Sequence, residues 1–319
     1  MKLLNYKTNI KQALNIAPVL FLCTTLLISS LFWGACKRVE DSSYFKEEIN
    51  QYELNNYVGE TEFSLANDTS YPVYPSDIEF LSLQSKGKNE ESNTIKALYI
   101  GNLATVSTDT IFLVCHDYNN HNDYYFNKAK IIFNSGKSIH KGVLMIDYQG
   151  FGLSEGEQRL SQITNDIKAG IEWLQKRGVT SSNFVMYGHG FGAIPACELS
   201  IFNAADSLIT PGKLILENPV GHSDLAVSSA LQINIPSSYL GNYTFDNFNK
   251  IKEYGADLLV LISEKDEKFN PDINGQKLYD FHNGSFKSIK KIKDATHRNI
   301  IPLLTYKEFV SLIENFIRR

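Results

Sequence analysis

Short apolar runs alternate with longer segments of helical periodicity from residue 78 to the end of the chain. The apolar runs predict strands at 78–83, 95–100, 110–115, 142–147, 183–187, 213–217 and 257–262. Helical periodicity occupies 122–134, 162–176, 191–202 and 306–317. This alternation predicts an α/β fold with a mostly parallel sheet, opened by an antiparallel pair at 78–83 and 95–100.

The N-terminal 35 residues follow a different pattern. Three lysines, the last of them Lys11, precede an uncharged stretch that runs to Cys36, an order typical of a signal peptide. Gly34 and Ala35 stand directly before Cys36, as in a bacterial lipobox, so residues 1–35 are predicted to be a lipoprotein signal peptide and Cys36 to carry the lipid. An uncleaved transmembrane segment is the alternative, since a span needs about 20 apolar residues. Both predict a domain in the cell envelope, facing the periplasm or the cell surface.

Residues 36–75 are polar and rich in Glu, Asn, Ser and Tyr. Two Tyr-Pro pairs, at 71–72 and 74–75, favour extended backbone at the end of this stretch. We therefore expect a lipid-anchored spacer over 36–75, with a helix at 41–54, and the folded domain over 76–319.

Charge and cysteine content exclude several classes of function. The 31 basic and 35 acidic residues form no basic stripe, which argues against a nucleic-acid partner. Of the four cysteines, Cys23 lies in the signal segment, Cys36 is the lipidation site, and Cys115 and Cys197 are expected to be buried free thiols. The chain has no metal-ligand spacing, and we expect neither a metal nor a cofactor.

The segment 183–196 reads as a strand, an abrupt turn and a helix. Gly188 and Gly192 stand where a nucleophile elbow needs small residues, so that the strand and the helix can approach closely. The position between them, where such an elbow carries serine, is Gly190.

With this elbow, the chain from about residue 76 onward resembles the α/β-hydrolase superfamily. It is most similar to dienelactone hydrolases, serine aminopeptidase-like hydrolases and fermentation-respiration-switch esterases. Further matches are 116–118 (His-Asp-Tyr for His-Gly-Asn), the run 147–156, Asp266 after a strand, and His297 near the end. The resemblance implies an eight-stranded sheet with helices on both faces and a short lid at 221–248.

The resemblance also assigns roles to site residues. It implies that Asp266 and His297 are the retained members of a Ser-Asp-His triad, and that Gly190 holds the nucleophile position without its serine. The backbone N–H of Phe191 and one from the loop after His116 would form the oxyanion hole. Asp117 replaces the usual glycine of that loop, and a carboxylate there would repel a developing oxyanion unless turned outward.

A second serine fits the literal G-x-S-x-G pattern, within 152–156. An elbow requires a strand running directly into the serine and a helix running directly out of it. Ser154 lies several residues after its strand and before the next helix, so we predict a structural loop serine.

The missing serine leaves three functional hypotheses open. The protein is a pseudohydrolase that binds an ester, acyl or peptide ligand, or a partner, without turnover. Alternatively it is an active esterase or peptidase that uses water or a non-standard nucleophile, with His297 as base and Asp266 orienting it. In the third hypothesis it is an envelope scaffold with a closed pocket.

Overall fold

The computed structural model describes residues 49–319 except 66–67, 119, 136–138, 202–206, 233–235 and 240–242. The predicted signal peptide, Cys36 and most of the predicted helix at 41–54 lie outside the described residues. Where that predicted range is described, the backbone forms only the short 3-10 helix η1 (Leu54–Asn56). Among the described residues, no helix combines the length and apolar character needed to cross a membrane.

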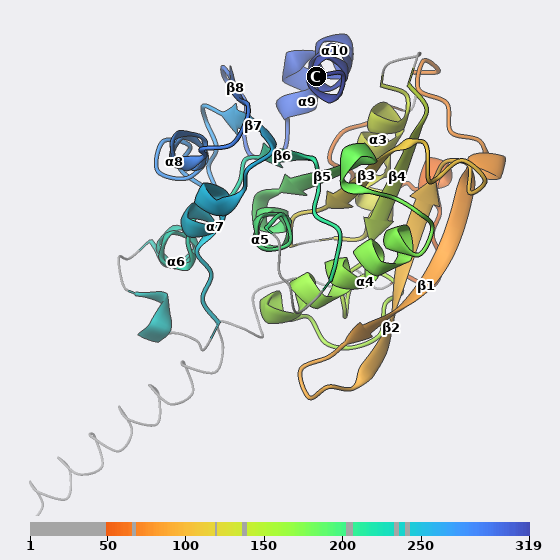
Figure 1. Cartoon of the computed structure of the whole chain (residues 1–319), viewed down its shortest axis with the longest axis horizontal. Coiled ribbons are helices and arrows are strands. Elements are labelled where there is room, and N and C mark those ends of the chain that lie inside the picture. Colours follow the sequence, from red (N-terminus) through yellow and green to blue (C-terminus); the bar gives the residue numbers. More distant parts are fainter. Residues whose placement is uncertain are drawn as a thin grey trace, which may run out of the picture.

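Eight strands form one sheet in the order β1-β2-β4-β3-β5-β6-β7-β8 (Figure 1). Their bounds are β1 Ile78–Lys86, β2 Ser92–Ile100, β3 Thr110–Cys115, β4 Lys141–Ile146, β5 Phe184–His189, β6 Lys213–Glu217, β7 Asp257–Ser263 and β8 Lys287–Ile292. β1 and β2 pair antiparallel, as does β2 with β4, and all other pairs are parallel. This is the predicted mostly parallel eight-stranded sheet.

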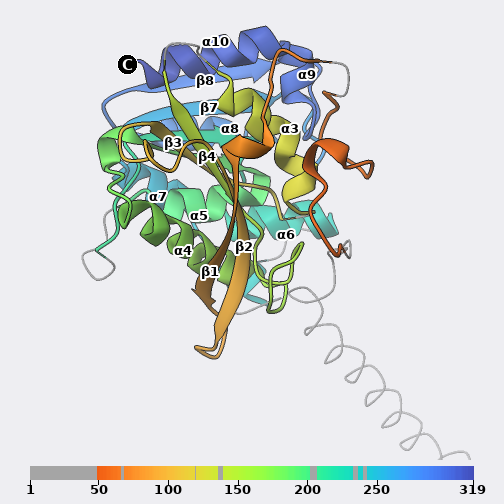
Figure 2. The same ribbon diagram turned by 90° about the vertical axis from the view of Figure 1, so that its right-hand side faces the viewer.

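Helices cover both faces of the sheet (Figure 2). One face carries α4 (Ile163–Gln175), α5 (Ala193–Glu198), α7 (Asn247–Glu253) and α8 (Gly275–Phe281). The other carries α3 (Asn122–Phe133), α9 (Ile300–Leu304) and α10 (Tyr306–Ile317). Side chains of the central strands alternate between the two layers: Leu113 packs in the first and Val114 in the second. Because both faces are covered, such strands are apolar throughout.

The described part of the predicted spacer packs as part of the domain. Phe63, Leu65 and Val73 are buried in the same layer as α3 and α10. The backbone N–H of Leu54 donates to Asp123 Oδ1 at 2.7 Å, at the start of α3. The apolar side chains of this stretch occur singly among polar residues, so they form no run that would predict a core segment.

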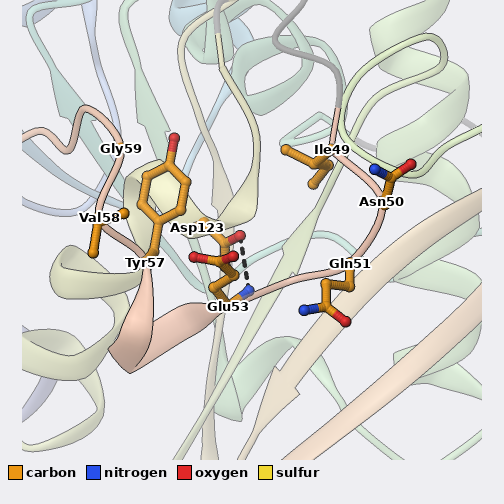
Figure 3. A pocket seen from close by; sticks show the side chains of 8 residues that line it. All are labelled: Ile49, Asn50, Gln51, Glu53, Tyr57, Val58, Gly59 and Asp123. Carbon is orange, nitrogen blue, oxygen red and sulfur yellow. Dashed lines mark hydrogen bonds between the residues drawn. The ribbon is translucent and has the colours of Figure 1, made fainter.

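This N-terminal stretch also walls a hollow of about 440 Å³ beside the start of α3 (Figure 3). The Asp123 carboxylate lies in this hollow and accepts the backbone N–H of Glu53 at 3.1 Å. The hollow therefore lies where residues 49–59 pack against the start of α3.

Candidate active site

The turn after β5 has the geometry of a nucleophile elbow. Gly190 has a φ of +57°, a conformation that favours glycine. A Cβ atom at Gly188 would lie 2.8 Å from the Ala196 Cβ, and one at Gly192 would lie 2.0 Å from the Cys115 carbonyl oxygen. The strand and the following helix thus approach as closely as the sequence predicted, and glycine is required on both sides of position 190.

His297 and Asp266 meet beside this turn. The His297 Nδ1 atom lies 3.0 Å from Oδ1 and 2.9 Å from Oδ2 of Asp266, and both side chains are almost fully buried. The backbone N–H groups of Lys268 and Phe269 donate to Asp266 Oδ1 at 2.8 Å and 2.9 Å. The loop after β7 therefore fixes the carboxylate, which in turn orients the imidazole.

Asp117 points into the site rather than away from it. Its Oδ1 atom accepts the backbone N–H groups of Tyr118 and Phe191, each at 2.9 Å. Its Oδ2 atom accepts a hydrogen bond from Lys268 Nζ at 2.6 Å and lies 3.2 Å from His297 Nε2. Phe191 is one of the donors that the resemblance assigns to an oxyanion hole, and Tyr118 lies in the loop after His116 that would supply the other. An internal carboxylate thus occupies the position that the resemblance assigns to a substrate oxyanion.

The same carboxylate fills the space beside Gly190. A Cβ atom at Gly190 would lie 2.5 Å from Oδ1 and 2.6 Å from Cγ of Asp117. A serine side chain therefore has no room at the elbow while Asp117 keeps this position. The sequence predicted that an inward carboxylate would oppose an oxyanion, and the structure adds that this carboxylate excludes the nucleophile as well.

Comparison with known proteins finds sequence similarity over part of the chain. No family model matches the chain. The chain is 28% identical over 136 residues to human alpha/beta hydrolase domain-containing protein 17C, covering 41% of this chain and 37% of that protein. Human alpha/beta hydrolase domain-containing protein 17B is 25% identical over 138 residues, covering 41% and 42%. The matched region thus spans less than half the length of these curated relatives.

Solved structures cover more of the chain. The esterase Pf2001 of Pyrococcus furiosus superposes on 78% of this chain and 94% of its own, with a TM-score of 0.57 and 17% identity. Est1E from Butyrivibrio proteoclasticus, solved with ferulic acid bound, covers 75% and 100%, with a TM-score of 0.56 and 14% identity. The chain therefore has the α/β-hydrolase fold. Within this fold the turn after β5, the two backbone donors and the His-Asp pair are present, but position 190 has no serine.

The ionisation of the site follows from its burial and its charges. Burial alone would raise the pKa of Asp117, but the Lys268 ammonium and the hydrogen bond to His297 hold it well below its ordinary value. Burial opposes the charged form of His297, yet its hydrogen bonds to Asp117 and Asp266 raise its pKa to about 9. His297 therefore carries a proton at neutral pH and serves as a cation between two carboxylates rather than as a base.

A pocket of about 510 Å³ opens next to this arrangement. Its lining residues are Phe191, Ala226, Ser229, Ala230, Glu267, Lys268, Phe269, His297 and Arg298. The residues from Ala226 to Ala230 belong to α6 (Ser223–Leu231), which lies within the predicted lid at 221–248. The Lys268 side chain lines the pocket and its ammonium contacts Asp117, so this lysine forms the inner wall.

His189, directly before Gly190, lies behind the catalytic positions. Its ring stacks on His297 with centroids 5.1 Å apart, and its Nε2 atom lies 3.2 Å from the His297 carbonyl oxygen. Burial and the Lys128 ammonium lower the pKa of His189 to about 3, so this ring is neutral. His189 therefore does not take the place of the missing serine.

A buried ionic cluster behind His189 was not predicted from the sequence. Lys128 Nζ lies 2.8 Å from Glu62 Oε1 and 2.5 Å from Glu217 Oε2, and Tyr187 donates to the same Glu217 oxygen. Glu62, His189 and Glu217 each place one possible ligand atom here. These three atoms lie within 4.8 Å of one another, a spacing that could hold a metal ion. Here the Lys128 ammonium supplies the cation. The cluster joins the N-terminal segment, α3, β5 and β6, which lie far apart in the sequence.

Ser154 is a structural residue of the loop after β4, as predicted. Its Oγ atom donates to the Asp147 carbonyl oxygen at 2.7 Å and accepts the Lys96 backbone N–H at 2.8 Å. The first bond ties the loop to the end of β4, and the second ties it to β2. Together they hold the Ser154 hydroxyl group in the loop.

Proposed function

We propose that this chain is a lipoprotein of the cell envelope whose α/β-hydrolase domain binds a ligand without forming an acyl-serine intermediate. The observation that carries the proposal is the position of the Asp117 carboxylate. Acyl transfer needs an attacking oxygen at the elbow and free N–H donors for the oxyanion. Gly190 supplies no oxygen, and Asp117 already accepts both donors.

Loss of the nucleophile alone leaves roughly 10³ to 10⁴-fold acceleration over water in well-studied triads, from the oxyanion hole and substrate binding. In this chain the hole is filled by Asp117 as well. We therefore expect even less residual ester or amide hydrolysis than a serine deletion leaves.

The two other hypotheses fit the site less well. A hydrolase that uses water needs a neutral His297, and the pKa of that side chain is raised to about 9. A scaffold with a closed pocket does not account for the cavity of about 510 Å³ at the site. An ester, acyl or peptide ligand, or a protein partner, held in this cavity without turnover is the best-supported function.

The proposed membrane anchor rests on the N-terminal pattern that ends at Cys36. Metabolic labelling with a palmitate analogue is expected to mark the full-length protein and to be lost in Cys36→Ser. A Cys36→Ser protein that keeps the label would overturn the lipoprotein assignment.

The catalytic part of the proposal has its own test. The purified protein is treated with a serine-directed fluorophosphonate and assayed with p-nitrophenyl acetate, with His297→Ala as the matched control. We expect no covalent label and no difference in hydrolysis between the two proteins. A stoichiometric label, or a rate in the unaltered protein that falls about tenfold or more in His297→Ala, would refute it.

A further inference from the structure

The ammonium group of Lys268 occupies a seat formed by three other side chains. Its Nζ atom lies 2.6 Å from Asp117 Oδ2, 5.1 Å from the centre of the Phe191 ring and 5.5 Å from the centre of the Phe269 ring. A carboxylate combined with aromatic faces is a set of groups that binds ammonium ions. The seat is therefore built for a cation, and the chain fills it with its own lysine.

The anion at the bottom of the seat is buried, whereas the lysine is not. The Asp117 side chain is 2% exposed and the Lys268 side chain 30% exposed. Lys268 also lines the pocket of about 510 Å³, so its stem borders solvent-filled space on one side. Because the Lys268 side chain is partly exposed, we expect its ammonium to be displaceable, whereas two backbone N–H groups hold Asp117 Oδ1.

The charges around Lys268 favour a cation as its replacement. The charged groups of the site around Lys268 include three carboxylates and one histidine: Asp117, which its ammonium contacts; Asp266, which its backbone N–H contacts; and Glu267 and His297 on the pocket lining. Arg298, on the pocket lining, is paired with Glu60 at 3.1 Å. With Lys268 withdrawn, three carboxylates would face one imidazolium, and the pocket would carry excess negative charge.

The pocket walls beside the seat are apolar. Phe191 and Phe269 form one side, and Ala226 and Ala230 of α6 contribute small side chains. An unbranched hydrocarbon chain attached to the ammonium would bury apolar surface against these walls. The ligand class is thus a primary amine on an alkyl chain, which is the chemistry of the lysine side chain itself.

We propose that the pocket binds a primary alkylammonium group, which displaces Lys268 from Asp117 and from the faces of Phe191 and Phe269. The group comes from a free alkylamine or from a lysine side chain of a partner protein. This inference rests on the proposed function, because Asp117 must hold a ligand instead of giving way to a substrate carbonyl. Lys268 then acts as an internal competitor that only a suitable amine replaces.

The test is isothermal titration calorimetry with n-pentylamine on the unaltered protein, on Lys268→Ala, and on the Lys268→Ala/Asp117→Asn double variant. We expect measurable binding to the unaltered protein and at least about tenfold tighter binding to Lys268→Ala, which lacks the competitor. The Asp117→Asn change keeps the side-chain shape but removes the anion, so it is expected to abolish the gain. Pentanol and pentanoate serve as matched ligands without the ammonium.

Three results would overturn the inference. They are no amine binding to any of the proteins, binding confined to Lys268→Ala, and tighter binding of pentanoate than of pentylamine. The last would mean that the N–H donors, not Asp117, govern the pocket. If Lys268→Ala fails to fold, the inference still predicts that n-pentylamine raises the Tm of the unaltered protein but not of Asp117→Asn, and equal Tm shifts would overturn it.

A second arm separates the two sources of the amine. The acetylated and amidated tripeptide Gly-Lys-Gly is titrated beside n-pentylamine. Tighter binding of the peptide favours a partner lysine, and tighter binding of n-pentylamine favours a free amine. A silent esterase assay with no amine binding would remove this inference alone, because the assay with p-nitrophenyl acetate tests the proposed function independently.

Discussion

A Cβ atom at Gly190 would lie 2.5 Å from Oδ1 of Asp117, well inside any permitted contact. The inward Asp117 carboxylate and a side chain at position 190 therefore exclude each other. The superfamily pattern that the sequence resembles has serine at the position of Gly190 and glycine at the position of Asp117. This chain therefore has the small residue and the functional residue exchanged between the two positions. The two departures are best understood as one coupled change.

This coupling predicts a destabilising effect of Gly190→Ala. The added methyl group meets Asp117, and the φ of +57° costs a non-glycine residue further energy, so we expect a loss of about 2–4 kcal/mol in the free energy of unfolding. Chemical denaturation measures the loss.

The control for this prediction is the same substitution in Asp117→Gly. Without the carboxylate the steric contribution disappears, and we expect Gly190→Ala to cost at least about 1 kcal/mol less in that background. Equal costs in the two backgrounds would show that positions 117 and 190 are independent.

The charge state of His297 predicts a pH dependence. Its folded-state pKa of about 9 lies above the ordinary value, so protonated His297 stabilises the fold. That contribution is fully present below about pH 6.5 and is lost as the pH rises through about 9. NMR titration is expected to give the raised pKa, and Asp117→Asn to lower it, because one of its two carboxylate partners is gone.

The matching stability measurement compares unfolding free energies at pH 6.5 and pH 9.5. The unaltered protein is expected to lose more stability over this interval than Asp117→Asn does. An equal or larger loss in Asp117→Asn would contradict the assigned ion pair between Asp117 and His297.

The buried cluster predicts a strong effect at Lys128. Lys128→Met leaves Glu62 and Glu217 without their cation in a buried site, and breaking such a pair costs about 3–5 kcal/mol. Lys86→Met is the matched surface control: its lysine is 73% exposed, and the expected change is within about 0.5 kcal/mol. Similar denaturation midpoints for the two variants would mean that the cluster does not hold the fold together.

The packing of the N-terminal segment predicts that two truncated proteins differ in stability. A protein that begins at residue 49 keeps Phe63, Leu65 and Val73, whereas one that begins at residue 76 exposes the surface that these side chains cover. Each buried side chain of this size stabilises by roughly 1.5–3 kcal/mol, so the shorter protein is expected to lose at least about 4 kcal/mol. Thermal unfolding compares them, and equal Tm values would restore the interpretation of residues 36–75 as a free spacer.

The sequence predicted most of the sheet because its parallel strands are buried on both faces and read as apolar runs. β8 was not predicted because Lys287, Lys290 and Lys291 interrupt its apolar pattern, as is common on an edge strand. The short helices α6, α7 and α8 were not predicted because seven to nine residues give too few turns for a clear periodicity.

Part of the candidate site could be predicted because some of its residues lie in local sequence motifs. Gly190, Asp266 and His297 stand in motifs of consecutive residues, and the structure brings them together. Asp117 pairs with Lys268, which lies 151 positions away, and Glu62 meets Lys128 only through the path of the N-terminal segment. Such long-range ion pairs leave no local pattern, so only the folded chain reveals them.

We infer that the Asp117 carboxylate takes the space that a serine side chain at position 190 would need. Steady-state hydrolysis of p-nitrophenyl acetate by the unaltered protein, Gly190→Ser and Gly190→Ser/Asp117→Gly tests it most directly. We expect background rates for the first two proteins and a kcat/KM at least about 100-fold higher for the double variant, in which the serine has room and both N–H donors are free. Full activity in Gly190→Ser alone, or continued silence of a folded double variant, would contradict it.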